Sequence, residues 1–275
     1  MIGELDDQVI AARRALLDGL EALRSHTASC VLVGAQAVYL HTGASSIAVA
    51  EFTTDADLAL DPRSLANAPL LGDALRAAGF TAAAQPGTWL SREGIELDLL
   101  VPAALAGAGR RGARLAVHGN AVARKAKGLE AALADHAPRL ISSLEPNVDA
   151  RQWEIRVANP SALLVAKLHK IGDRVSDADR RQDKDALDVL RLLQATPTAP
   201  LAERMSLLTL DPMCGRATLE AMELLELLFV DPRRPGVQMV GRAVGVLDDR
   251  ATVEAACVVL AKELLAVVRQ PALAA

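Results

Sequence analysis

The sequence predicts an α/β domain followed by an α-helical region. Up to about residue 158, short apolar runs and a run with a period of two alternate with helical segments, whereas from Pro160 onward apolar residues recur at helical spacing. A length of 275 residues leaves room for one large domain or two ordinary ones. We therefore expect an α/β domain over residues 1–158 and a helical C-terminal domain over residues 159–275.

The composition is that of a globular protein, with 51% hydrophobic and 23% charged residues. A net charge of −4 provides no bulk attraction to nucleic acid or to an anionic membrane, so any basic surface must be local. The sequence has no run of about 18 apolar residues and starts with the acidic stretch MIGELDDQVI, which predicts neither a membrane span nor a signal peptide. We expect a cytoplasmic protein with no membrane partner.

The N-terminal part begins with an amphipathic helix, in which apolar residues from Val9 to Leu23 recur at three- and four-residue steps. The apolar run CVLV follows and predicts a short strand that stops at Gly34. After it, AQAVYLHT indicates a brief helix that ends at Gly43. The free N–H groups at the start of that helix could hold a phosphate.

The next predicted strand carries two aspartates. Between Phe52 and Leu60, the residues Thr53, Asp55 and Asp57 share one face, and apolar residues occupy the other. Aspartate is depleted in strands, and a buried ionised carboxylate needs a positive partner or a metal. This strand therefore either faces water or faces something cationic.

A helix over residues 64–79 and a strand over residues 95–102 complete the predicted α/β core, and Asp98 lies on the polar face of that strand. Asp55 and Asp57 are about 6 to 7 Å apart by the strand rise, and Asp98 could supply a third carboxylate. Hard oxygen ligands suit Mg²⁺, and a pair of such ions can stabilise an in-line phosphoryl displacement. A charged, solvent-exposed strand is the alternative interpretation.

The rest of the chain reads first as short strands and then as helices. Possible strands lie at ARLAV, AVARKA and WEIRVA, between Gly109 and Ala158. A helix is predicted to begin at Pro160 with Asn159 as its cap, and the later segments indicate a bundle. Two of these helical segments carry cations that could bind a triphosphate or could form a solvated helix face: Lys167, Lys170, Arg174, Arg180, Arg181 and Lys184.

A structural interpretation is favoured for several other residues. Cys30, Cys214 and Cys257 lie far apart without the spacing of metal ligands, so we expect them to be buried small hydrophobic residues. Packing or hydrogen bonding is likewise favoured over catalysis or base stacking for His41, His169, Tyr39 and Trp89.

Taken together, these motifs resemble the nucleotidyltransferase superfamily with the DNA-polymerase-β-like fold, and within it the AbiEii-type toxin nucleotidyltransferases, which include the MenT group. The resemblance rests on VLVGAQAVYLHTG, FTTDADLAL, IELDLL, PSALLVAKLHK and RRQDKDALDVL, and it covers about residues 30–192. It implies a polymerase-β-like nucleotidyltransferase core with a mixed sheet, followed by an α-helical bundle.

The resemblance implies roles for five residues of the first half. Gly34 takes the place of the family's glycine at the phosphate-binding turn. Thr53 takes the place of the hydroxyl residue two positions before the first metal aspartate. The metal positions of the family fall on Asp55, Asp57 and Asp98.

Two further roles fall in the second half. Lys167 matches a lysine that the family implies binds nucleotide phosphate, and Asp185 matches an aspartate thought to complete the site, with Asp188 as a structural neighbour. One position departs from the superfamily pattern, because Ala35 follows Gly34 where Gly-Ser or Gly-Gly is usual. Backbone N–H groups remain available to a phosphate there, but a serine hydroxyl does not.

By resemblance, the protein transfers a nucleotidyl group from an NTP to an acceptor hydroxyl with two Mg²⁺ ions. The implied acceptor is a tRNA 3′ end, and the implied role is that of a toxin with a cognate antitoxin. The local groups GRRGAR and ARKAK could contact RNA. An aromatic content of 2% leaves few side chains for stacking on bases, which keeps open a small acceptor such as an aminoglycoside, or a protein side chain. The missing Gly-Ser hydroxyl leaves open a non-catalytic protein that binds nucleotide or a partner.

Overall fold

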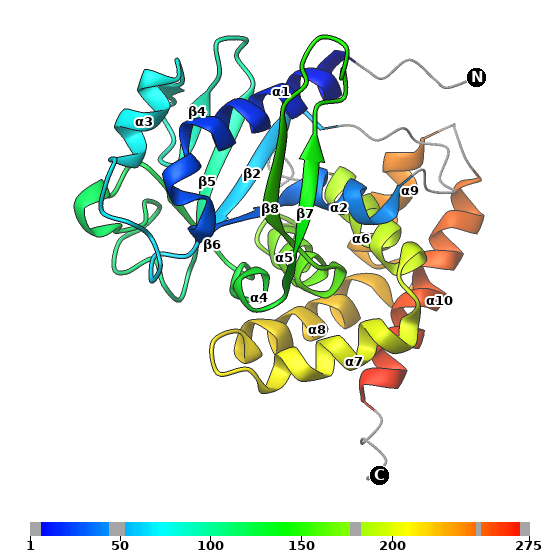
Figure 1. The fold of residues 1–275 in the computed structure, drawn as a ribbon. Helices are drawn as coiled ribbons and strands as arrows, with labels where there is room; N and C mark the ends of the chain where they lie inside the picture. The colour runs from blue at the N-terminus through cyan, green and yellow to red at the C-terminus, as the bar shows by residue number, and fades with distance from the viewer. Residues whose placement is uncertain (1–6, 44–52, 177–182, 246–248, 270–275) are drawn as a thin grey trace. The chain divides into compact units, whose positions relative to one another are not determined.

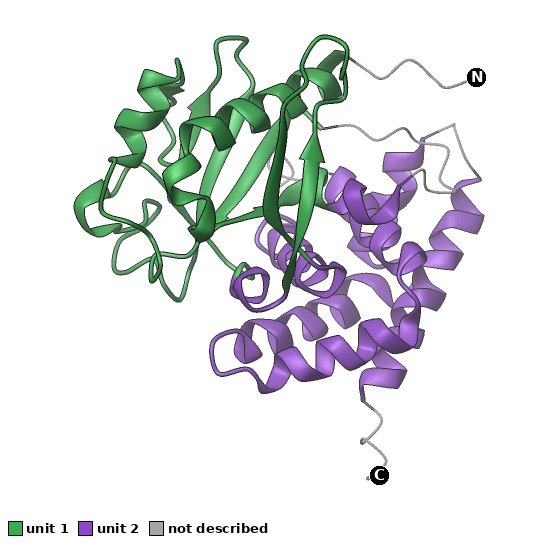
Figure 2. Ribbon diagram, in the orientation of Figure 1, with its two compact units in different colours: residues 1–37, 51–129, 136–158 green, residues 38–50, 130–135, 159–275 purple. Residues whose placement is uncertain are grey.

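The computed structural model describes residues 7–43, 53–176, 183–245 and 249–269. The chain forms two compact units: unit 1 comprises residues 1–37, 51–129 and 136–158, and unit 2 comprises residues 38–50, 130–135 and 159–275 (Figure 2). Phe52 of the predicted aspartate strand and the predicted phosphate-binding cations Arg180 and Arg181 lie outside the described residues. The expected division of the chain into an α/β domain over residues 1–158 and a helical domain over residues 159–275 stays a prediction.

Unit 1 is built on a mixed eight-stranded sheet (Figure 1). Its main path runs β3-β4-β5-β2-β1-β8-β7, and β6 pairs with β5. Because β1 is antiparallel to β2 whereas β2 is parallel to β5, the sheet is mixed, and the predicted α/β core is confirmed. The strands are β1 (Cys30–Val33), β2 (Asp55–Leu60), β3 (Thr81–Ala82), β4 (Thr88–Leu90), β5 (Glu96–Pro102), β6 (Arg124–Ala126), β7 (His136–Ser142) and β8 (Gln152–Ala158).

Helix α1 (Asp7–Ala22) packs against β2 and β5 and lies across one face of the sheet (Figure 1). Its buried face carries Leu16, Leu17 and Leu20, none of which is exposed. Three leucines at this spacing form the apolar stripe that the sequence periodicity predicted, so the N-terminal helix is confirmed.

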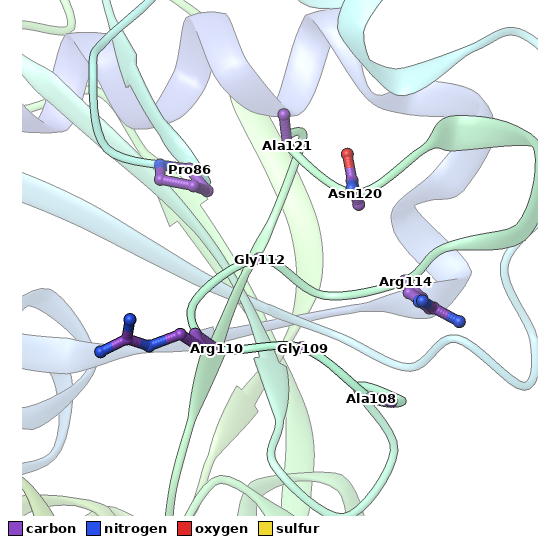
Figure 3. Close-up of a pocket in the computed structure, with 8 residues that line it drawn as sticks. All are labelled: Pro86, Ala108, Gly109, Arg110, Gly112, Arg114, Asn120 and Ala121. Carbon is purple, nitrogen blue, oxygen red and sulfur yellow. The ribbon is translucent and has the colours of Figure 1, made fainter.

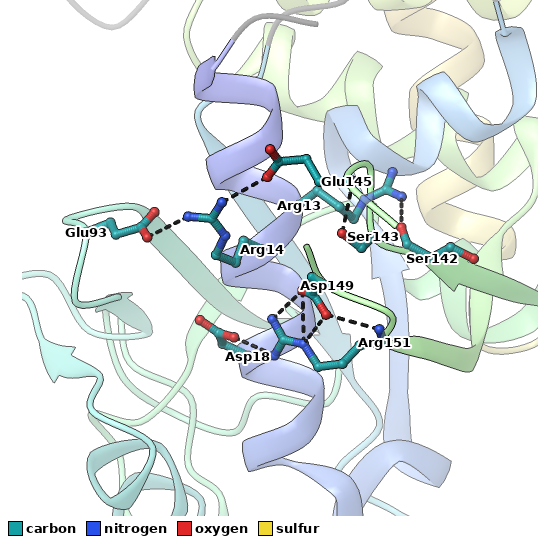
Figure 4. A network of polar contacts seen from close by, with 9 residues as sticks. All are labelled: Arg13, Arg14, Asp18, Glu93, Ser142, Ser143, Glu145, Asp149 and Arg151. Carbon is teal, nitrogen blue, oxygen red and sulfur yellow. Dashed lines mark hydrogen bonds and ion pairs between the residues drawn. The ribbon is translucent and has the colours of Figure 1, made fainter. Parts of the chain in front are cut away.

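The polar side of α1 is tied to distant parts of unit 1 (Figure 4). Arg14 donates to Glu93 at 2.7 Å and to Glu145 at 3.0 Å. Arg151, which follows the turn between β7 and β8, donates to Asp18 at 2.6 Å. These ion pairs link the first helix of the chain to the last hairpin of the sheet.

The structure differs from the sequence-based predictions at three places around the sheet. The predicted helix over residues 64–79 is shorter, since α3 covers Leu71–Ala77. Pro69 explains the late start, because proline disfavours helical backbone at the residue before it. Strand β7 was not predicted, because Pro138 interrupts its pattern; the strand lies at the end of the sheet order, where a missing N–H is tolerated. The segment ARLAV contains a bridge at Leu115 but no named strand.

Unit 2 is helical, as predicted. Helix α5 starts at Pro160 after the N-cap Asn159, whose side-chain amide donates to Asp135 at 2.8 Å rather than capping the helix. The three cysteines of the chain are buried, which confirms their interpretation. In the described part of the chain, no helix combines the length and the apolar character needed to cross a membrane. The helices of this unit are α4 (Glu130–Ala134), α5 (Pro160–Gly172), α6 (Asp183–Ala195), α7 (Thr198–Leu210), α8 (Gly215–Phe229), α9 (Pro235–Val244) and α10 (Arg250–Val268).

Candidate active site

Two aspartates of unit 1 are direct neighbours on adjacent parallel strands. Asp57 of β2 pairs in register with Asp98 of β5. Residues paired in this way point to the same face of a sheet, with strands about 4.8 Å apart. Asp57 is 8% exposed and Asp98 is 5% exposed, so both carboxylates lie near the protein interior. Like charges in direct cross-strand positions repel each other, so this arrangement raises the free energy of the folded chain unless a cation offsets it.

The same face carries two further carboxylates one step back along the strands. Asp55 lies two residues before Asp57 and pairs in register with Glu96. Thr53, which is 1% exposed, donates its hydroxyl to the Asp55 carboxylate at 2.7 Å. This hydrogen bond orients Asp55 and gives the predicted hydroxyl residue a geometric role.

Gly34 brings the start of α2 (Gly34–Thr42) against this face. The residue before it, Val33, pairs in register with Asp57 across the antiparallel strands. Gly34 has a φ of 72°, and a β-carbon there would overlap the carboxylate of Asp57. Only glycine therefore allows the helix to begin next to this aspartate. The partial positive charge of a helix N-terminus favours an anion at that position.

Asp98 has two polar partners on the side away from Asp57. The hydroxyl of Thr88, its register neighbour on β4, donates to one carboxylate oxygen at 2.7 Å. A guanidinium nitrogen of Arg124 on β6 donates to the other oxygen. A second nitrogen of that guanidinium, Nη1, is buried without a hydrogen-bond partner among the described residues. Arg124 thus supplies positive charge beside the acidic face.

The donor set on this face fits a hard divalent cation. Mg²⁺ prefers carboxylate oxygens and takes its remaining ligands from water and substrate phosphates. In the described conformation Asp55 is bonded to Thr53 and Asp98 to Thr88, and no three acidic, histidine or cysteine side chains of the described residues are grouped as a metal site. Binding of a cation at Asp55, Asp57 and Asp98 would therefore require these side chains to turn toward a common point.

Four sequence-predicted residues of unit 2 form a separate group together with Arg191, which no pattern indicated, whereas the predicted cations Arg174 and Lys184 are not part of it. We call this group the α5–α6 ladder: Lys167, Lys170, Asp185, Asp188 and Arg191. Lys167 Nζ lies 2.8 Å from Asp185 and 2.7 Å from Asp188. Lys170 Nζ lies 3.1 Å from Asp185, and Arg191 lies 3.5 Å from Asp188. The side chain of Lys167 is 5% exposed, whereas that of Lys170 is 30% exposed.

Lys167 and Asp185 of the ladder keep their charges at neutral pH. Burial lowers the pKa of Lys167, but the carboxylates of Asp185 and Asp188 outweigh that effect and raise the pKa well above its usual range. Burial likewise raises the pKa of Asp185, and the charges of Lys167 and Lys170 reverse this and hold it below its usual range. Removal of one partner from a buried ion pair of this kind strongly destabilises the fold, because the other charge stays buried without compensation.

The structure therefore brings Gly34, Thr53, Asp55, Asp57 and Asp98 together in unit 1, and it pairs Lys167 with Asp185 in unit 2. Sequence reasoning missed two contacts of Asp98. Thr88 belongs to a three-residue strand that no pattern indicated. Arg124 belongs to the segment AVARKA, which was predicted as a possible strand and contains β6, but its side chain was interpreted as a possible RNA contact. Thr88 and Arg124 contact Asp98 because β4 and β6 both pair with β5, and the spacing of residues along the chain does not reveal the order of strands in the sheet.

Two residues considered for base stacking have packing partners. Trp89 is 2% exposed and donates its indole N–H to the Val122 carbonyl at 3.0 Å. The guanidinium of Arg191 lies 5.1 Å from the centre of the Tyr39 ring. The ring of His169 contacts the Ala217 carbonyl at 2.8 Å. These contacts support the structural interpretation of all three residues.

The chain matches the model of a family described as nucleotidyltransferase over residues 13–208, which is well over half of its length. The matched region contains the acidic face of unit 1 and the α5–α6 ladder of unit 2. A search of curated proteins finds no match. The family match favours an enzyme over a non-catalytic binding protein. The chain belongs to this nucleotidyltransferase family, and the protein is an enzyme that transfers nucleotidyl groups.

Proposed function

We propose that this enzyme is a Mg²⁺-dependent nucleotidyltransferase whose acceptor is the 3′ end of a tRNA. The observation that carries the metal assignment is the register pairing of Asp57 with Asp98, next to Asp55 on the same strand face. Bound Mg²⁺ would neutralise the negative charge of the triphosphate during transfer. The face carries four carboxylates, in the register pairs Asp55–Glu96 and Asp57–Asp98, and we propose that it holds two ions.

The reaction forms one bond and breaks one. The acceptor hydroxyl oxygen bonds to the α-phosphorus of the NTP, the bond from that phosphorus to the bridging oxygen breaks, and pyrophosphate leaves. One carboxylate of the acidic face accepts the proton of the acceptor hydroxyl. Before substrate binds, Thr53 holds Asp55 and Thr88 holds Asp98, and these two carboxylates would turn toward Asp57 to hold the cation. The start of α2 at Gly34 offers backbone N–H groups to a phosphate.

The α5–α6 ladder enters this proposal as a source of positive charge for the NTP. By resemblance, Lys167 contacts phosphate and Asp185 completes the site. Within the ladder Lys170 has the more exposed ammonium group, while Lys167 is held by two aspartates. We therefore propose that Lys167 organises the ladder and that Lys170 shares the contact with phosphate.

The proposed biological role is that of an AbiEii-type toxin, with a cognate antitoxin as partner. This role rests on the resemblance of motifs such as FTTDADLAL and RRQDKDALDVL. Transfer to a small hydroxylated molecule or to a protein is the second candidate. It is favoured by the burial of Trp89, which removes one of the chain's six aromatic side chains from base stacking.

The test uses NTPs labelled at the α-phosphate, incubated with the purified full chain, Mg²⁺ and three pools of acceptors: total RNA, cell protein and small aminoglycosides. We expect label on tRNA, at the 3′ end, and no label when EDTA replaces Mg²⁺ or when Asp57→Ala replaces the parent chain. Label in the protein or small-molecule pool with unlabelled RNA would establish the second candidate instead.

A further inference from the structure

One segment of unit 1 has a charge opposite to that of the whole chain. Between Asp98 and Glu130 the sequence contains no acidic residue. The same stretch contains six cations: Arg110, Arg111, Arg114, Arg124, Lys125 and Lys127. In a protein with a net charge of −4, such a segment concentrates positive potential on one part of the surface.

The segment encloses a small cavity (Figure 3). Its volume is about 290 Å³, and its lining includes Arg110, Gly112, Arg114 and Asn120. Figure 3 shows the backbone passing Gly112 between the side chains of Arg110 and Arg114. A cavity of this size is at the lower end of the range for ligand sites, so it suits a phosphate with part of its sugar rather than a complete nucleoside triphosphate.

The backbone around the cavity is held in place by hydrogen bonds. Ala113 donates to the Ala123 carbonyl, and the Arg111 carbonyl accepts from Lys125, both at 2.9 Å. Ala113 is fully buried, so its neighbour Arg114 is directed outward. The close approach at this point requires a glycine, because a β-carbon at Gly112 would overlap the Asn120 carbonyl. The cavity is therefore preformed.

Arg110 and Arg114 line this cavity, and Arg111 lies between the lining residues Arg110 and Gly112 in the chain. We call these three residues the arginine rim. All three are exposed, and none forms an ion pair with a carboxylate in the part of the chain that the structure describes. Elsewhere in unit 1, Arg14 and Arg151 each contact two carboxylates (Figure 4). The rim arginines thus contribute no comparable contact to the fold.

The rim is connected to the acidic face through one residue. Arg124 forms an isolated bridge with Gly112, at the cavity, and its side chain reaches Asp98. Both features belong to unit 1. An acceptor strand that lies along the rim can therefore extend toward the carboxylates at which its end would react.

We propose that the cavity and the arginine rim bind backbone phosphates of the RNA acceptor, upstream of its reacting 3′ end. Guanidinium groups pair with phosphate oxygens in a bidentate geometry and remain charged at all physiological pH values. This inference rests on the proposed transfer to RNA, and it adds the surface that holds the strand.

The test measures RNA binding separately from transfer. A fluorescein-labelled single-stranded RNA whose 3′ end is blocked by a phosphate is titrated with the full chain at 50 and 200 mM salt. In the variant Arg110→Gln/Arg111→Gln/Arg114→Gln, we expect the Kd for RNA to rise at least about tenfold at the lower salt, and the salt slope to fall by about two. NTP affinity should stay within twofold, because the rim is separate from the carboxylates.

The control variant Arg216→Gln/Arg233→Gln/Arg250→Gln removes the same charge from exposed arginines of unit 2, each of which pairs with a nearby carboxylate. Its RNA affinity should stay within twofold of the parent. Equal losses in both variants, unchanged RNA binding in the rim variant, or a selective loss of NTP affinity would overturn the inference. If the parent chain binds RNA through the rim but labels no RNA, the proposed transfer to RNA is wrong and the proposed RNA-binding rim is retained. If both variants label RNA as the parent does, transfer to RNA is retained and the rim proposal is wrong.

Discussion

The acidic face of unit 1 and the α5–α6 ladder of unit 2 both bury aspartates, yet their partners differ. In the ladder each aspartate is contacted by Lys167, and Asp185 gains Lys170 as well. On the acidic face, the residue paired in register with Asp57 on β5 is another aspartate, Asp98. The ladder matches opposite charges and stabilises packing between two helices, whereas the face places like charges side by side. We infer from this difference that the acidic face is arranged to bind a cation, whereas the charges of the ladder already satisfy one another.

The largest expected effect separates activity from stability on the acidic face. Asp57→Ala should lower the rate of nucleotidyl transfer at least about a thousandfold, because a charge-stabilising ligand position is lost. The free energy of unfolding should stay equal or rise, since repulsion with Asp98 is relieved. Initial rates and urea unfolding measure the two quantities. Asp73→Ala, an exposed carboxylate of α3, is the control, and a fold weakened by Asp57→Ala would break the comparison.

The ladder should show the opposite behaviour. Lys167→Met should lower the free energy of unfolding by about 3 to 5 kcal/mol, because it leaves Asp185 and Asp188 buried with less positive charge. Lys170→Met, at a more exposed position, should cost less than about 1 kcal/mol. Urea unfolding measures both. NTP titration at low temperature should also show a larger rise in Kd for Lys167→Met than for Lys170→Met. If the two variants show small and equal changes in the free energy of unfolding and in the Kd for NTP, Lys167 neither stabilises the fold nor binds the substrate.

Acid should weaken the α5–α6 ladder by protonating Asp185. The folded-state pKa of Asp185 is lowered, so its contribution is present above the unfolded pKa of about 3.9 and is lost as pH falls below that value. We expect the free energy of unfolding to fall progressively as the pH drops from about 4 through the lowered folded-state pKa of Asp185, and to fall less steeply in Asp185→Asn. Urea unfolding at several pH values measures the slopes. Identical slopes in the parent and the variant would place the acid sensitivity elsewhere.

The smallest expected effect concerns the cation that the acidic face already has. Arg124→Gln removes the guanidinium beside Asp98, so a divalent cation should bind more tightly, on the order of tenfold. Electron paramagnetic resonance of Mn²⁺ measures this binding without any substrate. Arg92→Gln, an exposed arginine of the same unit, controls for net charge. Weaker Mn²⁺ binding in Arg124→Gln would mean that the guanidinium supports the metal ligands rather than competing with the cation.

Local patterns predicted the strands and helices that carry most of the candidate site. The alternation around Asp55 and Asp57 identified β2, and Pro160 marked the start of α5. The pairing of Asp57 with Asp98 could not be predicted, because register depends on contacts between segments about forty residues apart. Likewise, nothing in the helix pattern distinguishes the buried Lys167 from a lysine on a solvated face, since its aspartate partners lie on the next helix.

The tie between α1 and the last hairpin of unit 1 has a consequence for synthesis on the ribosome. Asp18 reaches its partner Arg151 across more than 130 residues of sequence, and β1 gains its parallel neighbour β8 at Val157. Until that part of the chain emerges, β1 has an open edge toward β8, although the strands that carry the aspartates are already made. The nascent chain therefore leaves one edge of a fully apolar strand unpaired until residue 157 has been made, and chaperones that bind extended apolar segments have access to that edge of Cys30–Val33 over this interval.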